Sequence, residues 1–394
     1  MNRKQFAILL VLLVVLGGAG LLLQRSRDTD ANSGAGGVGQ KLLGDKFAVN
    51  DVTHIVIKHD TNELNLVKKD DVWRVRERND YAANFQEIGD FLLKARDLKV
   101  VQKEQIGASD MNRMELAQGQ GVKSGVLVDL KSKDEKSLQS LMLGKKHMRK
   151  APPQQSQFGD EGFPDGRYVM LTGDTKNVML IGDALGNVEP KPETWLKKDF
   201  FKVERPKAIA VTFAEATNSW KLVRDTDSGD WKFAQAKPEE KLDSAKVSGV
   251  SNPFSSPSFN DVLPLNVKPE EHGLDKPTMV TIETFDDFTY TVKVGKKAGD
   301  DYPLTMSAVA NFPKERVLAK DEKPEDKAKA DKAWQDRQKQ LEEKLKQNQA
   351  FEKWAYLVPS YIVDPILKER KDLLVEKKDE PKPTAQVDSA EEKK

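Results

Sequence analysis

The chain of 394 residues contains no cysteine. This absence excludes disulfides, thiolate metal sites, cysteine nucleophiles and a lipid-modified cysteine anchor. An excess of charge of either sign is also lacking, because 64 Lys and Arg face 63 Asp and Glu. A balanced surface gives no electrostatic reason to expect nucleic acid as a partner. The apolar content of 38% is low, so part of the length must be solvated helix, linker or tail.

Familiar catalytic motifs are missing as well. The sequence has no serine nucleophile elbow, no P-loop and no HExxH motif. Carboxylates are abundant, but the sequence does not show which of them converge, so a glycosidase-like pair stays open and unsupported. We therefore assign no catalytic, cofactor-binding or metal-binding residue, expect no cofactor, and predict that the protein is not an enzyme.

One long apolar run is present, FAILLVLLVVLGGAGLLL from Phe6 to Leu23. As a helix it spans about 27 Å, close to the bilayer core of about 30 Å. A cleaved signal peptide would have a shorter apolar region that ends at small residues, whereas Leu21 to Leu23 lie where cleavage would begin. The run predicts a transmembrane anchor at 6–23 that contacts the lipid bilayer, after a cytoplasmic tail at 1–5.

The charges around this anchor are nearly balanced, because Arg3 and Lys4 precede it and Arg25 and Arg27 follow it. A short tail before one anchor and a long polar domain commonly inserts with the tail inside. We predict a single-pass protein with the short tail in the cytoplasm and the large C-terminal domains outside it.

Residues 24–44 are predicted to form a flexible linker because they are polar and rich in glycine. They contain GAGGVG, from Gly34 to Gly39, which matches the pattern G-x-G-x-x-G. A dinucleotide-binding fingerprint needs a preceding strand and a following helix. An apolar anchor and a polar spacer precede this one, which favours a linker.

The remaining chain contains a duplication with a period of roughly 150 residues. Thr53–Glu77 and Lys207–Gln235 each show an alternating strand, a turn, a second strand, an acidic turn and then a tryptophan, so that Trp73 matches Trp231. Each copy continues with two strands that end in GKK, at Lys146 and at Lys297. The pattern predicts an α+β protein with two tandem, related antiparallel-sheet domains, at 45–205 and 206–375.

Helical segments are expected between the hairpins of each copy. In the first copy a stripe at helical spacing should pack on one face of the sheet, namely Phe85, Ile88, Phe91, Leu92, Ala95 and Leu98. The stripe in the second copy is weaker and is interrupted by prolines: Leu242, Val247, Val250, Pro253 and Pro257.

A charged insertion from about Pro313 to Gln349 is strongly helix-forming. Its apolar residues are sparse (Trp334, Leu341 and Leu345), and no apolar heptad is sustained. A solvated helical arm is therefore favoured over a partner-binding coiled coil. Residues 376–394 are predicted to form a disordered, charged tail.

The stretch DTDSGD places Asp225, Asp227 and Asp230 around Gly229, as ligands surround a calcium ion. The alternating residues on both sides are typical of a hairpin, and Asp, Ser and Gly favour turns. A common calcium loop would add a bidentate Glu further on, whereas a strand begins at Trp231. We interpret this stretch as a turn.

The four histidines do not form a cluster in the sequence. His54 and His59 share a strand but are five residues apart, so they face opposite sides and cannot share a metal. The second copy has Ala208 and Phe213 at these places. His272 follows Glu270 and Glu271, and a deep pocket in which these side chains converged would favour an enzyme.

The last histidine, His147, belongs to a basic group with Lys145, Lys146, Arg149 and Lys150. Such a group can hold an anion, but at the end of a hairpin it is more typical of a solvated face.

The order of these segments resembles the bacterial family known as domain of unknown function 4340. The resemblance rests on the anchor MNRKQFAILLVLLVVLG, strands ending in DDVWRV and GDWKF, the LGKK strand, and closing strands YVML and YLVPSYIVDPIL. It covers most of residues 45–375 outside the charged insertion, which departs from the family pattern and leaves the pairing of the last strand of the second copy open.

This resemblance implies a membrane-anchored protein, often encoded beside ABC transporters of the gliding-motility type, with no catalytic residues to carry over. Together with the predicted orientation, it implies a single-pass protein of the bacterial cytoplasmic (inner) membrane with its C-terminal domains in the periplasm. The resulting hypothesis is a non-catalytic accessory or scaffold protein whose partners are ABC transporter subunits, since half-solvated antiparallel sheets offer large contact surfaces. The alternative hypothesis is a protein that binds or hydrolyses cell-envelope glycan.

Overall fold

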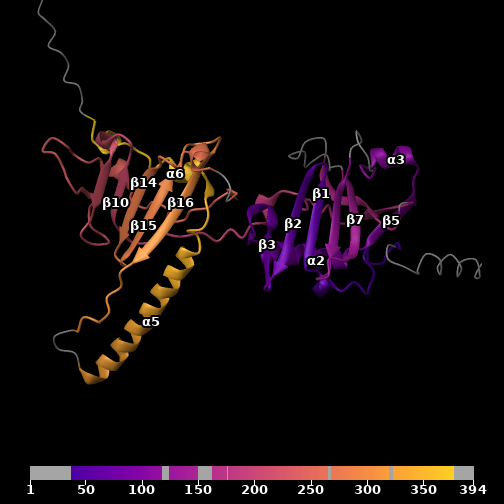
Figure 1. Ribbon diagram of the computed structural model, residues 1–394, viewed down its shortest axis with the longest axis horizontal. Helices are drawn as coiled ribbons and strands as arrows, with labels where there is room; N and C mark the ends of the chain where they lie inside the picture. Colours follow the sequence, from indigo (N-terminus) through magenta and orange to yellow (C-terminus); the bar gives the residue numbers. More distant parts are fainter. Residues whose placement is uncertain are drawn as a thin grey trace, which may run out of the picture. The chain divides into compact units, whose positions relative to one another are not determined.

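The computed structural model describes residues 37–117, 124–149, 162–174, 176–264, 268–318 and 323–376. The chain divides into two compact units, Met1–Lys198 and Asp199–Lys394. Each described unit is built on one antiparallel sheet (Figure 1).

The predicted anchor, Phe6 to Leu23, lies outside the described residues, as does the tail after Glu376. Among the helices in the described part of the chain, none has both the length and the apolar character that crossing a bilayer requires.

The first unit contains a nine-stranded sheet with the order β4-β3-β2-β1-β6-β7-β8-β9-β5. Its strands are β1 (His54–His59), β2 (Asn62–Lys69), β3 (Val72–Val75), β4 (Tyr81–Ala82), β5 (Val100–Gln105), β6 (Val126–Lys131), β7 (Ser137–Arg149), β8 (Phe163–Leu171) and β9 (Asn177–Ile181). Its helices are α2 (Phe85–Asp97) and α3 (Ala108–Arg113), with 3-10 turns η1 (Val49–Asp51), η2 (Arg76–Arg78) and η4 (Pro192–Trp195).

The second unit contains an eight-stranded sheet with the order β12-β11-β10-β14-β15-β16-β17-β13. Its strands are β10 (Pro206–Thr212), β11 (Trp220–Val223), β12 (Lys232–Phe233), β13 (Asp261–Val262), β14 (Thr278–Thr284), β15 (Phe288–Val294), β16 (Asp301–Ala310) and β17 (Tyr356–Pro359). Its helices are α4 (Ser244–Ser248), α5 (Pro324–Gln349) and α6 (Ser360–Val363), with 3-10 turns η5 (Ala216–Asn218), η6 (Pro269–His272) and η7 (Arg370–Leu373).

The two sheets have the same strand order once the short edge strand β4 is set aside. The register also agrees: Ile55 pairs with Leu66 in the first unit, and Ile209 pairs with Leu222 in the second. The repeat in the sequence is therefore a repeat of topology, and the expected mixture of antiparallel sheets and a few helices is confirmed.

The GKK segments explain part of this shared topology. A Cβ atom on Gly144 would lie 2.4 Å from the carbonyl oxygen of Met114, and one on Gly295 would lie 2.3 Å from that of His272. The next backbone N–H groups, of Lys145 and Lys296, each donate to that same carbonyl oxygen at 2.8 Å. Only glycine allows this close approach, so both units need it at the same point.

The first unit places a helix over its core. Asn84 caps α2 by accepting hydrogen bonds from the backbone N–H groups of Gln86 and Glu87, and the helix buries four side chains: Ile88, Phe91, Leu92 and Ala95. Phe85 was predicted to lie in this buried stripe, but its side chain is 69% exposed. That prediction is wrong because Phe85 is the first residue of α2 and lines a surface groove.

The second unit covers its core differently. Its helix α4 has only five residues and buries only Val247. Aromatic side chains from irregular segments and strands pack together instead, with ring centroids 4.6–6.3 Å apart: Phe200, Phe201, Phe254, Phe259, Tyr290 and Tyr356. The helical segment predicted between the hairpins of the second copy is therefore reduced to the one short helix α4.

One further segment differs from expectation, and the pairing after the charged insertion is now defined. The end of the predicted linker, residues 37–44, packs on the first unit, where Leu42 and Leu43 are buried. The charged insertion joins β16 to β17, where the first unit has only residues 172–176 between β8 and β9. β17 nevertheless pairs with β16, Tyr356 opposite Leu304, which resolves the pairing that the sequence left open.

Candidate functional site

The acidic stretch that resembles a calcium loop connects β11 to β12, which pair as an antiparallel hairpin with Leu222 opposite Phe233. The predicted turn is confirmed by this pairing. Asp225 lies 2.7 Å from the ammonium of Lys232. Asp227 accepts from Arg205 Nε at 2.9 Å and from Arg224 Nη2 at 2.8 Å. Cationic side chains thus contact the oxygens of both carboxylates.

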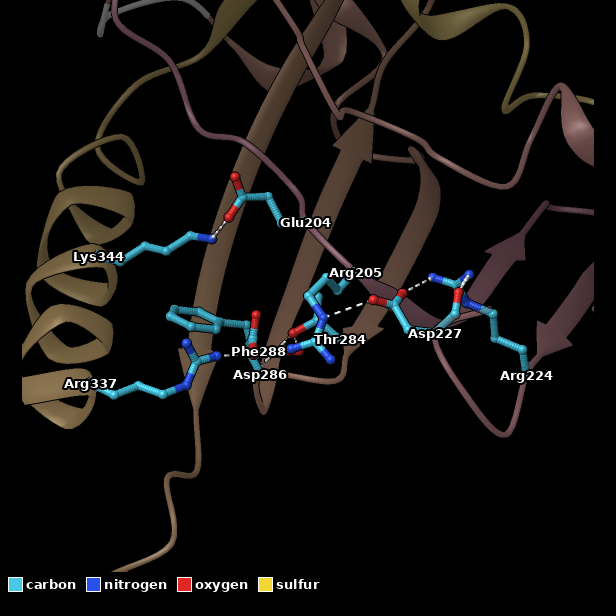
Figure 2. Close-up of polar contacts among 9 residues, drawn as sticks. All are labelled: Glu204, Arg205, Arg224, Asp227, Thr284, Asp286, Phe288, Arg337 and Lys344. Carbon is cyan, nitrogen blue, oxygen red and sulfur yellow. Dashed lines mark hydrogen bonds and ion pairs between the residues drawn. The ribbon is translucent and has the colours of Figure 1, made fainter. Parts of the chain in front are cut away.

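Asp227 belongs to a larger network that holds α5 on the second sheet (Figure 2). Asp286, in the β14–β15 turn, accepts from Arg205 Nη1 at 2.7 Å and from Arg337 Nη2 of α5 at 2.6 Å. The Asp286 side chain is only 12% exposed. Two guanidinium groups that share one shielded carboxylate are stronger partners than an isolated surface pair.

A second contact lies further along α5. Lys344 Nζ lies 2.7 Å from the carboxylate of Glu204 and 5.3 Å from the ring centroid of Phe288. This ammonium holds the pKa of Glu204 below its ordinary value. Near the end of α5, the buried Asn348 Nδ2 lies 3.1 Å from the hydroxyl of Tyr290, and burial raises the pKa of Tyr290 to about 12.

These contacts lie in the C-terminal half of α5, while its N-terminal half extends past the sheet (Figure 1). Trp334, Leu341 and Leu345, the apolar residues noted in the sequence, are each partly covered. The arm is therefore a solvated helix with an anchored base.

The histidines of the first strand have separate surroundings. His54 is buried; its Nδ1 lies 2.8 Å from Glu135 Oε2 and its Nε2 lies 2.9 Å from Asn65 Oδ1. The hydrogen bond from His54 holds the pKa of Glu135 below its ordinary value. His59 is exposed, 3.7 Å from Asp60. Within the described ranges no three His, Asp or Glu side chains are arranged to hold a metal ion.

His272 lines a pocket of about 310 Å³ together with Glu352, Lys353 and Trp354. Glu270 and Glu271 do not line this pocket. The convergence of His272 with its two acidic neighbours, which would favour an enzyme, is therefore not seen.

The basic group around His147 contains a carboxylate. Asp165 of β8 lies 2.6 Å from His147 Nδ1 and 3.7 Å from Arg149 Nε. The hydrogen bond from His147 holds the pKa of Asp165 below its ordinary value. Lys145 is exposed, and Lys150 lies outside the described residues. The carboxylate of Asp165 therefore offsets part of the positive charge of this basic group, which agrees with a solvated hairpin end.

An apolar groove lies in the first unit, between α2, η1 and the β2–β3 hairpin. It has a volume of about 500 Å³, and these side chains line it: Val49, Asn50, Val52, Lys68, Trp73, Phe85, Gln86, Ile88, Gly89, Asp90, Leu92 and Leu93. Val52, Trp73 and Ile88 are buried and form its apolar floor, while Phe85 and Leu93 (47% exposed) stand at its margin. Concave apolar surfaces with a few polar groups are the usual form of binding sites.

Gly89 lies inside α2, where glycine costs roughly 0.5–1 kcal/mol relative to alanine. A Cβ atom placed on Gly89 would have no heavy atom within 4 Å. Packing within the unit therefore does not require glycine here, in contrast to Gly144 and Gly295.

The sequence did not reveal this groove. Phe85 continues the apolar spacing of α2 and was for that reason placed in the core. The available signal was its position directly after the capping residue Asn84, because the first turn of a helix often extends past the layer that it covers. The other wall comes from η1, whose placement depends on tertiary packing.

The chain belongs to the family described as Domain of unknown function (DUF4340), whose sequence profile matches residues 73–277. The match is more than half of the 394 residues and confirms the resemblance drawn from the sequence. It begins in β3 and ends just before β14, so α5 lies beyond it. Searches of curated proteins and of solved structures gave no match.

Proposed function

We propose that this member of the family is a membrane-anchored, extracytoplasmic accessory or scaffold protein without catalytic activity, associated with an ABC-type transport complex. The observation that carries the proposal is the apolar groove along α2, because its exposed Phe85 and Leu93 leave apolar area that a partner protein would bury.

Membrane attachment in this proposal rests on the apolar run from Phe6 to Leu23. Only residues 24–36 separate that run from Gly37, the first residue that the structure describes. Fully extended, such a segment reaches about 45 Å, so an anchored chain would hold the α2 groove near the bilayer. Partners that lie in the same membrane are then within reach. The transport-complex part of the proposal rests on the family resemblance alone.

The proposal is tested by cross-linking in native membranes. A photo-crosslinking amino acid replaces Gln86, an exposed residue of the groove, in the full-length chain. The matched control carries it at Tyr361, which is 72% exposed in the second unit. We expect membrane transport subunits to be cross-linked from position 86 and not from position 361.

The proposal would be contradicted if transport subunits were cross-linked in equal yield from the two positions, or if no membrane protein were cross-linked from position 86. Glycan recovered with the purified chain, or cleavage of glycan by it, would instead support the alternative of a cell-envelope polymer-binding protein or hydrolase. Two further results would refute the membrane part: release of the intact chain from vesicles by carbonate, or its resistance to protease added to spheroplasts.

A further inference from the structure

We infer that the occupant of the α2 groove is an amphipathic α-helix of a partner protein, with an apolar stripe flanked by basic residues. This inference rests on the proposed function, because it specifies the partner that the groove would bind.

The shape of the groove favours a helix. Phe85, Gly89 and Leu93 follow each other at intervals of four residues along α2, which places them on one side of the helix. The side chains are large, absent and large in turn, so they form two ridges with a gap between them. Ridges and gaps at this spacing accept the side chains of a second helix.

Gly89 supports close approach at the centre of this surface. Nothing in the unit occupies the space that its Cβ atom would fill, although glycine weakens the helix. Glycine is the usual residue where another backbone must come near. A large apolar side chain of a partner helix fits above Gly89, between Phe85 and Leu93.

An extended strand is a poorer occupant. A partner strand binds by pairing its backbone with a free sheet edge. The margin of the groove toward Phe85 and Leu93 is α2, whose backbone groups are already bonded within the helix. Side chains therefore provide the contact there, as in helix-in-groove recognition.

The charges at the margin favour a basic partner. Asp90 lines the groove and Asp51 belongs to η1, which forms the opposite wall; both are exposed. Neither carboxylate has an ion-pair partner among the described residues. The cation of the groove, Lys68, already lies 3.1 Å from Asp71. Lys or Arg beside the apolar stripe would complement the two free carboxylates.

The test uses the full-length chain in neutral detergent with the photo-crosslinking amino acid at Gln86. Two fluorescent probes are compared: an amphipathic helical peptide of leucine and lysine, and the same peptide with glutamate in place of every lysine. We expect the lysine peptide to reach half-maximal cross-linking at a concentration lower by about tenfold or more. A lysine peptide interrupted by prolines should lose cross-linking, because it cannot form a helix.

Variants localise the effect. Gly89→Leu fills the gap and should weaken cross-linking of the lysine peptide by about tenfold or more. Asp90→Lys should abolish the preference for the lysine peptide. Asp134→Lys, an equally simple charge reversal at an exposed site of the β6–β7 connection, should retain it. A thermal melt of each variant separates loss of the groove from loss of the fold.

The inference is wrong if both peptides cross-link equally, if the glutamate peptide is preferred, or if the proline-containing peptide binds as well as the helical one. It is also wrong if Asp90→Lys and Asp134→Lys act alike. These failures differ from failure of the proposed function. A native membrane subunit captured from position 86 through a segment without an apolar, basic-flanked helix would sink the inference and leave the proposal standing.

Discussion

The two units share one strand order but differ at an equivalent tryptophan. Val75 of the first unit and Phe233 of the second hold the same ladder position, so Trp73 and Trp231 correspond. Trp73 is buried and forms the floor of the α2 groove. Trp231 is half-buried, with the guanidinium of Arg224 4.9 Å from its ring centroid.

This difference shows that the same sheet framework can carry different surfaces at equivalent positions. In the first unit the tryptophan lies beneath an open apolar groove. In the second unit the cation that covers it belongs to the arginine–carboxylate network that holds α5. The framework itself depends on contacts that recur in both units, above all the glycines that precede the two lysine pairs.

Substitution of these two glycines should cause the largest loss of stability in the shared sheet framework. Gly144→Ala and Gly295→Ala each place a Cβ atom against a backbone carbonyl, so each should lower the free energy of unfolding by about 3 kcal/mol. Urea unfolding of the full chain measures the loss. Gly107→Ala, with no heavy atom within 4 Å of the added Cβ, is the control. A tolerated substitution in one unit alone would show that the two GKK segments are not equivalent.

An ion pair near the C-terminal end of the second unit provides a test that concerns this unit and not the first. Arg370 donates to both carboxylate oxygens of Glu240, at 2.9 and 2.6 Å, and its guanidinium lies 4.2 Å from the ring centroid of Phe233. The Glu240 side chain is only 8% exposed. Glu240→Gln should therefore lower the free energy of unfolding by about 2 kcal/mol at neutral pH, measured by urea titration.

The pH dependence of this loss has a definite sign. Arg370 lowers the pKa of Glu240 from 4.5 to about 2. The unfolded chain therefore takes up the proton first as pH falls, and the contribution of the carboxylate is present above pH 4.5 and disappears toward pH 2. The difference between wild type and Glu240→Gln should shrink over that range. A difference that stays constant would mean that the ion pair does not stabilise the folded state.

The helix α5 is another feature that the first unit lacks, and its attachment to the second sheet can be tested. Asp286→Asn leaves Arg205 and Arg337 without their shared charge and should weaken the anchoring of α5 by about 1 kcal/mol. Hydrogen exchange of the α5 backbone should become faster, and raised salt should narrow the gap to wild type. Asp336→Asn, at an exposed position in the middle of α5, should leave exchange unchanged. Unchanged exchange in both variants would assign the anchoring of α5 to its other contacts, including those of Asn348 and Lys344.

Local patterns in the sequence predicted the framework, because strand alternation, turn residues and the GKK repeat are local signals. The hairpin at DTDSGD was predicted correctly on that basis. The network that Asp227 joins was not predicted, since Arg205, Asp286 and Arg337 come from segments far apart in the chain. The groove was missed for the same reason: α2 is visible as a periodic stripe, but the packing of η1 beside it depends on the whole unit.

The smallest expected effect distinguishes a glycine inside α2 from the glycine that follows α4. Gly89→Ala should raise the free energy of unfolding by about 0.5–1 kcal/mol, because the helix gains a better former and the added Cβ meets nothing within 4 Å. Gly249→Ala, at the end of α4, should change little, since it follows the last helical residue and its Cβ would already touch the carbonyl of Lys246 at 3.4 Å. Thermal unfolding of both variants measures this contrast. A gain at Gly89 together with weaker partner cross-linking would mean that the glycine serves binding at the expense of stability, whereas a loss of stability would show that it serves the fold.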